Sequence, residues 1–387
     1  MKSFLYTLLL VFLNSVFAFA QEKKDVVAPN ENLIAENIAE IPKELANKVK
    51  KYTEARGATL AGVHPITNEI IVSTRFGVTP QLHHVKQPLG DRTQITFFDE
   101  PISNAIFEPT KGEYLIYAAD ASGNEFGQLY KLDLKTLTAT MLTSGGRSQN
   151  GGVTWRKDGK GFYYSSTKRN GKDRDIYFMD PGNPTNEKLV LEVKGGGWGI
   201  TDISSDYSKL LIRESISANE SYVWLLEIET GKLSEVTDRK SPNILQSGAS
   251  FSNNNNEIWI RSDIDNEFDR LGTFNLTTKK FTFYTSDIPW NVENYTLSED
   301  QKTLVFTTNE AGSSKMYIMD TATKLYNEVK NLPAGLLSSI RFTSNDATVF
   351  FTQSTAKSAS DVFQLILKTG EITRWTKSEL GQIQESV

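Results

Sequence analysis

The chain repeats one pattern of apolar and polar residues seven times. Each repeat opens with an apolar anchor and a short polar turn, followed by three runs of alternating apolar residues. The anchors lie 44, 48, 48, 48, 46 and 45 residues apart. A period of this length with four short strands is typical of a β-propeller, so we predict an all-β, seven-bladed propeller of four-stranded blades. The anchors are Val63, Phe107, Trp155, Ile203, Phe251, Leu297 and Phe342.

The residues around each anchor support this fold independently of the spacing. Turn formers such as Asp158-Gly159 follow the anchors, and they tolerate the tight or left-handed backbone of a hairpin. The second strands, such as residues 304–306, are aromatic and β-branched, whereas the fourth strands, such as 233–237, are polar and are predicted at the outer edge. We place Trp155 on an innermost strand facing neighbouring blades, where its replacement by Ala would cost about 3 to 5 kcal/mol.

The first twenty residues predict a cleavable secretory signal. Lys2 precedes an apolar run over residues 4–17, and Ala18-Phe19-Ala20 form a small-residue cleavage site. The run is too short to span a bilayer comfortably, and no second apolar stretch follows, so no membrane span is expected. We therefore expect an exported bacterial protein, periplasmic or secreted.

The remaining sequence divides into three parts. Residues 21–57 predict a polar leader and a short helix from about 42 to 56, with Leu45, Val49 and Tyr52 on one stripe. Two alternatives are open for this helix: it packs on the side of the propeller, or it binds another domain. The propeller itself is expected over residues 58–377, and residues 378–387 look like the start of a linker.

The composition excludes several classes of function. The 387 residues contain no cysteine, which excludes disulfides, thiolate metal sites and a cysteine nucleophile. The formal net charge is −5 and no basic cluster is present, so nucleic acid is a poor candidate partner.

A search for catalytic chemistry finds little. A serine hydrolase needs a nucleophile on a strained turn, often G-x-S-x-G, with a histidine base. The nearest match, residues 248–252, lacks the second glycine and coincides with an innermost-strand anchor. His83 and His84 are neighbours on a predicted strand and point to opposite faces, so one is expected to be packed and the other solvated. The glycines of residues 195–199 predict a tight connection between blades. We expect no catalytic residues, no metal and no cofactor.

The loops between second and third strands offer the best candidates for binding. All are expected on one face of the ring, and they carry carboxylates with an occasional arginine. Such groups could hold the amino terminus of a peptide or orient a partner domain, and the alternative is a solvated rim. Further members of this set lie at residues 263–267 and 309–310. The candidate substrate-binding residues are Asn124, Glu125, Asp173, Arg174, Asn219 and Glu220.

A family resemblance rests on eight segments spread over residues 43–381. They are residues 75–77, 81–83, 94–101, 123–130, 170–175, 195–199, 217–222 and 375–381. Together they resemble the propeller of exported bacterial peptidases of the prolyl oligopeptidase family, most specifically in the first four repeats. The resemblance implies an α/β-hydrolase domain after the propeller, an active site between the two, and a propeller that restricts access to short peptides. In some relatives, acidic propeller residues hold the substrate's amino terminus.

The chain departs from that family pattern at its end. It stops at Val387, about where the hydrolase domain would begin, so the family's serine, aspartate and histidine have no matching positions. We therefore expect the non-catalytic, substrate-gating half of a serine peptidase, with the hydrolase domain and short peptides as partners. The alternative is a stand-alone envelope propeller, similar to TolB-like proteins, that acts as a binding module. A propeller glycosidase or lyase would need paired carboxylates at catalytic separation.

Overall fold

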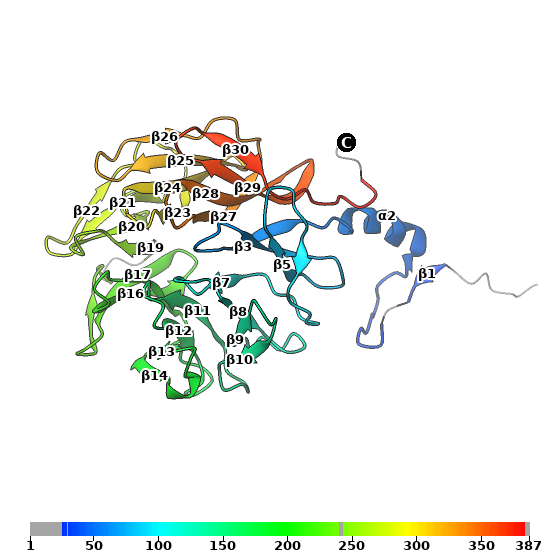
Figure 1. Ribbon diagram of the computed structural model, residues 1–387, viewed down its shortest axis with the longest axis horizontal. Helices are drawn as coiled ribbons and strands as arrows, with labels where there is room; N and C mark the ends of the chain where they lie inside the picture. Colours follow the sequence, from blue (N-terminus) through cyan, green and yellow to red (C-terminus); the bar gives the residue numbers. More distant parts are fainter. Residues whose placement is uncertain (1–24, 29, 240–242, 384–387) are drawn as a thin grey trace, which may run out of the picture. The chain divides into compact units, whose positions relative to one another are not determined.

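The computed structural model describes residues 25–28, 30–239 and 243–383 (Figure 1). The predicted signal therefore lies outside the described residues. Within the chain, two compact units separate: Met1–Ala55 with Leu380–Val387, and Arg56–Glu379.

Among its described residues, the smaller unit contains one helix and one short strand pair. Strands β1 (Val26–Val27) and β2 (Ile41–Pro42) pair antiparallel, and α2 (Lys43–Thr53) follows directly. Glu44 in the first turn and lysines in the last turn complement the helix dipole. The predicted apolar stripe is present, but Leu45, Val49 and Tyr52 are 52, 51 and 72% exposed. Whether the stripe covers the propeller or another domain stays a prediction.

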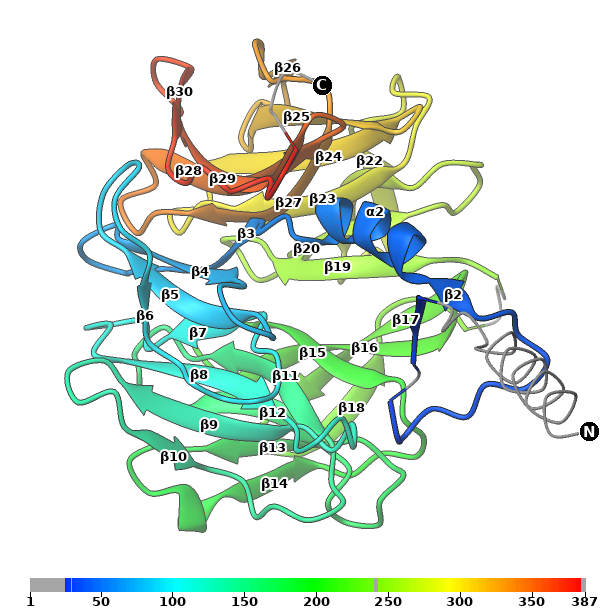
Figure 2. The ribbon, with the colours of Figure 1, turned by 90° about the vertical axis from the view of Figure 1, so that its right-hand side faces the viewer.

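The larger unit is a seven-bladed propeller, as the repeat predicts. Its described residues form seven four-stranded antiparallel sheets, in each of which the strands follow one another in chain order. Figure 2 shows the fourth strands at the periphery, while the first strands lie toward the centre and contact the first strands of neighbouring blades. The predicted outer position of the fourth strand is confirmed.

Each blade occupies one continuous stretch of sequence. Blades 1 to 4 comprise β3 (Ala58–Val63), β4 (Ile70–Thr74), β5 (Gln81–Val85), β6 (Thr93–Gln94); β7 (Ala105–Phe107), β8 (Tyr114–Ala119), β9 (Gln128–Asp133), β10 (Ala139–Met141); β11 (Asn150–Trp155), β12 (Phe162–Ser166), β13 (Asp175–Met179), β14 (Lys188–Leu191), with the 3-10 turn η2 (Pro184–Asn186); and β15 (Trp198–Ile203), β16 (Lys209–Ser217), β17 (Glu220–Glu227), β18 (Lys232–Glu235). Blades 5 to 7 comprise β19 (Gln246–Phe251), β20 (Glu257–Ser262), β21 (Arg270–Asn275), β22 (Lys280–Phe283); β23 (Val292–Leu297), β24 (Thr303–Glu310), β25 (Ser313–Asp320), β26 (Tyr326–Glu328); and β27 (Leu336–Phe342), β28 (Thr348–Thr355), β29 (Ser358–Ile366), β30 (Glu371–Arg374). Every anchor is the last residue of a first strand.

The strand directions give the propeller two chemically different faces. Because neighbouring strands run antiparallel, the connections from strand 1 to 2 and from 3 to 4 lie on one face, which we call the turn face. The connections from strand 2 to 3 and from blade to blade lie on the opposite face, the loop face. Since each blade has an even number of strands, the chain enters β3 and leaves β30 on the loop face.

Short side-chain hydrogen bonds shape the turns after the anchors. In blade 4 the Ser204 hydroxyl donates to Asp206 Oδ1 at 2.6 Å, and Asp206 Oδ1 accepts the Ser208 N–H at 3.0 Å. These side-chain bonds give partners to backbone N–H groups that would otherwise have none in the turn. The same hydroxyl contact recurs in the pairs Ser252–Asn254, Ser298–Asp300 and Thr343–Asn345.

In five blades, a buried threonine fixes the loop-face end of the fourth strand. The hydroxyl oxygen of a residue after the fourth strand accepts the N–H of a third-strand residue fourteen positions earlier. This bond satisfies a buried donor beyond the regular ladder. The pairs are Leu82–Thr96, Leu129–Thr143, Val223–Thr237, Leu271–Thr285 and Val362–Thr376.

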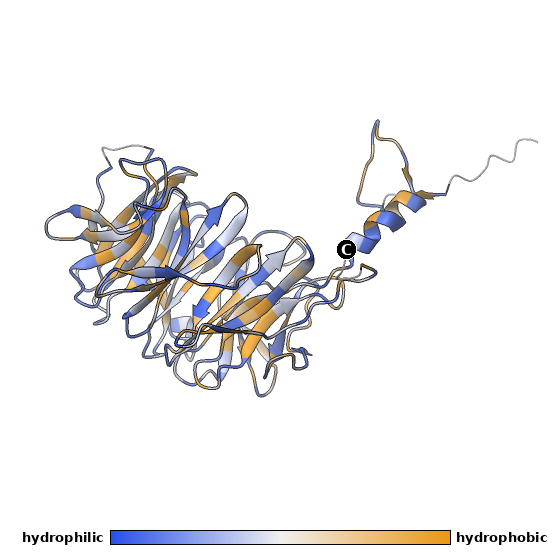
Figure 3. Ribbon diagram, turned by 90° about the horizontal axis from the view of Figure 1, so that it is seen from above, coloured by the Kyte–Doolittle hydropathy of each residue, from blue (hydrophilic) through white to orange (hydrophobic). Residues whose placement is uncertain are grey.

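The core lies between the blades. Figure 3 shows apolar residues interspersed with polar ones along the strands. Middle strands such as β4 and β12 are buried along their whole length, because both faces of a blade pack against neighbouring blades. The last blade meets the first without sharing a strand: Phe350 and Trp375 pack against Leu60 and Val72. The Leu60 N–H also donates to Thr352 Oγ1 at 2.9 Å. Side-chain packing therefore closes the ring.

Candidate functional site

The six predicted binding residues all come from blades 2, 3 and 4 and lie on the loop face. They follow the second strand of their blade, as the sequence predicts. Their surroundings, however, differ greatly from one blade to the next.

The loop of blade 2 presents an unengaged carboxylate. Glu125 has a backbone φ of 63°, and its N–H donates to Asp120 Oδ2 at 2.8 Å. Asn124 Oδ1 accepts the Phe126 N–H at 2.9 Å. These two bonds fix the backbone of the loop, whereas the exposed Glu125 carboxylate has no hydrogen bond or ion pair within the described residues. That carboxylate is therefore available to a ligand.

Asp173 in blade 3 is engaged inside the protein. Its carboxylate accepts the Gly195 N–H at 2.7 Å, the Asn170 amide at 2.7 Å and an Arg169 nitrogen at 3.3 Å. The Gly195 N–H, followed by the Asn170 amide, holds the pKa of Asp173 below its ordinary value. This residue joins its loop to the connection between blades 3 and 4.

The Arg174 side chain contacts polar groups of its own blade. Its guanidinium donates to Gln149 Oε1 at 2.9 Å and to Ser165 Oγ at 3.5 Å. Its Nε is buried without a partner among the described residues, so one donor remains for another group.

The Asn219–Glu220 pair is engaged by protein contacts only in part, unlike the free Glu125 carboxylate and the fully engaged Asp173 carboxylate. The exposed Asn219 donates its N–H to Ser217 Oγ at 3.3 Å. Glu220 is partly buried at the start of β17, and its carboxylate accepts the Tyr222 hydroxyl. One of its two oxygens thus stays free of protein contacts within the described residues.

Sequence reasoning missed a buried ion pair below the blade 3 loop. Asp175 is fully buried and accepts Arg169 Nε at 2.6 Å and the Val193 N–H at 3.0 Å. Arg169 and Asp175 are six residues apart in a charged stretch, which was the only signal available in the sequence.

A second buried pair lies in blade 5. Asp269 Oδ2 and Arg261 Nη1 are 3.4 Å apart. Burial raises the pKa of Asp269 to about 6, although the Arg261 charge acts in the opposite direction. Asp269 follows the candidate residues 263–267 in the same loop and was not among them.

A cavity of about 610 Å³ occupies the turn-face end of the central channel. Residues of all seven blades line it, and they include all seven anchors. Trp155 lies on the first strand of its blade, as predicted. This side chain packs against Tyr114 of blade 2, as predicted for a contact between blades, but it is only partly buried because its other side faces the cavity.

A smaller cavity of about 340 Å³ lies in blade 1 beside Phe76, His83 and Phe98. His83 is buried and its Nδ1 lies 2.9 Å from the Gln81 carbonyl oxygen, while burial lowers its pKa. His84 is partly buried and pairs with Glu69 at 2.7 Å. The prediction of one packed histidine is thus confirmed, but the other is paired rather than solvated. Neither cavity includes the six candidate residues.

Two glycine-containing motifs are structural, as predicted. Residues 248–252 begin in β19, and Gly195 to Gly199 span the connection from blade 3 to blade 4. A Cβ atom at Gly197 would clash with the Ser215 carbonyl oxygen. Within residues 25–28, 30–239 and 243–383, no cluster of three acidic or histidine residues has a geometry that could hold a metal. In that same part of the chain, no helix is both long and apolar enough to cross a bilayer.

Solved structures of prolyl oligopeptidases share this fold. A prolyl endopeptidase matches with a TM-score of 0.71 and 12% identity over 89% of this chain. It is one of two prolyl endopeptidases whose structures were studied for the role of inter-domain dynamics in catalysis and specificity. Prolyl oligopeptidase B from Galerina marginata matches with a TM-score of 0.67 and 13% identity, also over 89% of this chain. The chain spans 53% and 54% of the length of these two proteins.

The family itself is assigned by sequence. No curated protein matches the chain. The family described as "Prolyl oligopeptidase, N-terminal beta-propeller domain" matches residues 103–378, which is well over half of the sequence and includes blades 2 to 7. Blade 1, outside this match, completes the same ring in the structure. The chain therefore belongs to the prolyl oligopeptidase family and carries its N-terminal β-propeller domain.

Proposed function

We propose that this propeller is the non-catalytic, substrate-gating part of an exported serine peptidase that cleaves short peptides. In this proposal an α/β-hydrolase domain carries the catalytic residues, and the propeller limits which substrates reach them. Export rests on the signal-like pattern of residues 1–20. The family assignment favours this function over a TolB-like binding module.

One observation carries the proposal: both ends of the propeller lie on the loop face and are fastened to each other. The Arg56 N–H donates to the Glu379 carbonyl oxygen at 2.8 Å, and Arg92 pairs with the Glu379 carboxylate at 2.6 Å. A domain joined to either end would be tethered at this face.

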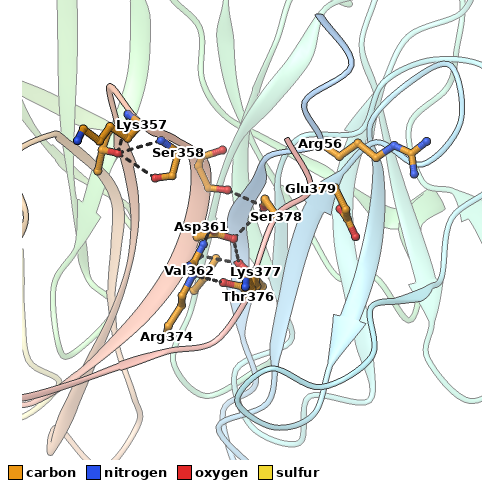
Figure 4. A network of polar contacts seen from close by, with 12 residues as sticks. Arg56, Lys357, Ser358, Asp361, Val362, Arg374, Thr376, Lys377, Ser378 and Glu379 are labelled. Carbon is orange, nitrogen blue, oxygen red and sulfur yellow. Dashed lines mark hydrogen bonds and ion pairs between the residues drawn. The ribbon is translucent and has the colours of Figure 1, made fainter. Parts of the chain in front are cut away.

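The exit from the last blade is held by a network around Asp361 (Figure 4). The buried Asp361 carboxylate accepts Thr376 Oγ1 at 2.7 Å, Ser378 Oγ at 2.8 Å and an Arg374 nitrogen at 2.5 Å. These charge-assisted bonds fix the path of residues 374–378. A domain that follows would start from a defined position on the loop face.

The loop-face carboxylates would meet the substrate. A peptide's ammonium group pairs with a carboxylate more strongly at a partly desolvated wall than on an open surface. Glu125 offers an unengaged carboxylate, and Glu220 offers one free oxygen. We assign both to the peptide's amino terminus. Asp173 keeps its loop in place, and this role is structural.

The test is kinetic and uses the full-length gene product, including whatever codons follow residue 387. Glu125→Gln and Glu220→Gln should raise KM for short peptides with a free amino terminus, and leave KM unchanged for amino-blocked peptides. Glu113→Gln is the matched control, because Glu113 is an exposed carboxylate on the turn face of the same blade as Glu125. Equal KM values for parent and variants on both substrates would contradict the assignment.

The present chain alone should be inactive. It is expected to hydrolyse no proline-containing peptide and to take no label from a serine-directed phosphonate, since no histidine follows residue 84 to act as a base. Stoichiometric labelling of one serine, together with peptide turnover, would overturn the non-catalytic role.

A further inference from the structure

The cavity in the central channel contains a cation without a counter-charge. Arg341 lies on β27, directly before the anchor Phe342, where the register of β27 shifts against β28. Such bulges redirect side chains. Within the described residues no hydrogen bond or ion pair engages the Arg341 side chain, and its Nε is shielded from solvent. Burial lowers the pKa of Arg341, and no neighbouring carboxylate opposes that effect.

At the equivalent position of blade 4, the side chain has hydrogen-bond partners within the protein. Asp202 directly precedes the anchor Ile203, as Arg341 precedes Phe342. Its carboxylate accepts the Phe251 N–H of the next blade at 2.7 Å and the Ile203 N–H at 2.8 Å. Asp202 therefore serves the fold by joining two blades, whereas Arg341 makes no such contact.

The acidic residues of the cavity wall are engaged elsewhere or lie on its rim. Asp346 accepts the backbone N–H groups of Glu299 and Asp300 at 2.6 and 2.8 Å. Glu299 itself is exposed. With Asp202 bonded to two backbone donors, no acidic residue of the lining pairs with Arg341.

Three other residues of the lining carry unpaired polar atoms. Trp155 Nε1 is a buried donor without a partner among the described residues, and Asn255 Oδ1 and Gln301 Oε1 are unpaired acceptors. These three atoms are shielded from solvent, like Arg341 Nε, so the guanidinium end of Arg341 is the polar group that the cavity offers to a ligand. The seven anchors add an apolar wall.

We propose that Arg341 is the cationic centre of a site for the C-terminal carboxylate of a short peptide, in the turn-face end of the central channel. A guanidinium binds a carboxylate through two parallel hydrogen bonds, which a lysine ammonium does not reproduce. A volume of about 610 Å³ is much larger than a carboxylate alone, so the site accepts the peptide body as well. The anchors then contact the apolar side chains of the peptide.

This site is distinct from the proposed loop-face site, because it lies at the opposite end of the channel and binds the opposite end of a peptide. The experiment therefore uses the full chain and an alanine tetrapeptide with an acetylated amino end. Such a peptide has no ammonium group for Glu125 or Glu220. Two forms are titrated by calorimetry, one with a free C-terminal carboxylate and one with a C-terminal amide.

The free acid should bind at least about tenfold more tightly than the amide, since a buried charged hydrogen-bond pair is lost in the amide. Arg341→Gln should weaken binding of the acid by about tenfold or more, and Arg341→Lys should restore only part of it. Lys160→Gln is the control, because Lys160 is a 75% exposed cation on the same face and lies outside the cavity lining. Its affinity should equal that of the parent.

Three outcomes would overturn the proposal: equal affinity for acid and amide, no binding of either, or binding of acetate as tight as that of the peptide acid. The comparison of acid with amide uses the parent protein, so the proposal stays testable even if Arg341→Gln does not fold. Circular dichroism establishes whether that variant is folded.

Discussion

The loops of blades 2 and 3 occupy the same position on the loop face, yet their acidic residues have different roles. In blade 2, Glu125 directs an unengaged carboxylate outward from a backbone that is fixed by Asp120. In blade 3, Asp173 and Asp175 bind a backbone N–H and an arginine inside the protein. Acidic residues near the same place in the repeat can therefore hold the fold together or stay available for a ligand.

The difference arises from the distance along the chain between partners. The contacts of the Asp120–Glu125 pair are local, within five residues. Asp173 reaches Gly195, 22 residues away, and Asp175 reaches Val193, 18 residues away. The blade 3 loop is thus part of the packing between blades 3 and 4, and mutations there should act on stability rather than on recognition.

Among the variants that compare these loops, Asp175→Ala has the largest expected effect. It leaves the buried Val193 N–H and the Arg169 guanidinium without their acceptor, which should lower the free energy of unfolding by about 3 kcal/mol. Urea unfolding measures the change. Asp120→Ala in the blade 2 loop is the comparison, and it should cost about 1 kcal/mol or less because its single bond lies in an exposed loop. Equal losses would remove the distinction between the two loops.

A pH-dependent effect of intermediate size is expected for Asp269→Asn in the blade 5 loop. Burial raises the folded-state pKa of Asp269 from 3.8 to about 6, so the native state binds its proton more tightly than the unfolded state. This carboxyl therefore lowers stability as the pH rises from about 4 to about 6, by about 1.4 kcal/mol for each unit of the pKa shift, and by a constant amount above that range. Relative to the parent, the variant should gain stability between pH 4 and pH 7. A parallel pH profile for the two proteins would show that Asp269 is paired more completely than its geometry indicates.

Asp173→Asn should give a smaller effect of opposite sign. Its folded-state pKa lies below the unfolded value of 3.8, so its contribution to stability is present above about pH 4 and is lost as the pH falls through the folded-state pKa. Melting temperatures of parent and variant should differ at pH 7 and converge at the acidic end of the profile. A difference that stays constant down to pH 2 would contradict an ionic role.

The smallest change in stability is expected for Glu125→Gln. An exposed side chain without protein contacts contributes within about 0.5 kcal/mol, so urea unfolding of this variant should coincide with that of the parent. Glu113→Gln serves as the reference. A clear destabilisation by Glu125→Gln alone would mean that the carboxylate has a structural partner, and it would weaken its assignment to substrate binding.

The sequence predicts the fold better than the site because the two depend on contacts of different range. The turn at Ser204–Asp206 and the alternation of β16 are local, so they are visible in a few consecutive residues. The bond from Asp173 to Gly195 crosses between blades, and nothing in the residues themselves distinguishes Asp173 from Glu125. The channel cavity takes residues from all seven blades, so Arg341 could be recognised as unpaired only after the ring was assembled.

Ring closure without a shared strand has a consequence for synthesis. Because the four strands of each blade are contiguous in sequence, every sheet can complete its hydrogen bonds as soon as its own segment has left the ribosome. Only the surface of the first blade must wait, since Leu60 and Val72 find Phe350 and Trp375 when the seventh blade arrives. Until then this face of the first blade stays exposed, and the last blade to be made is the one that covers it.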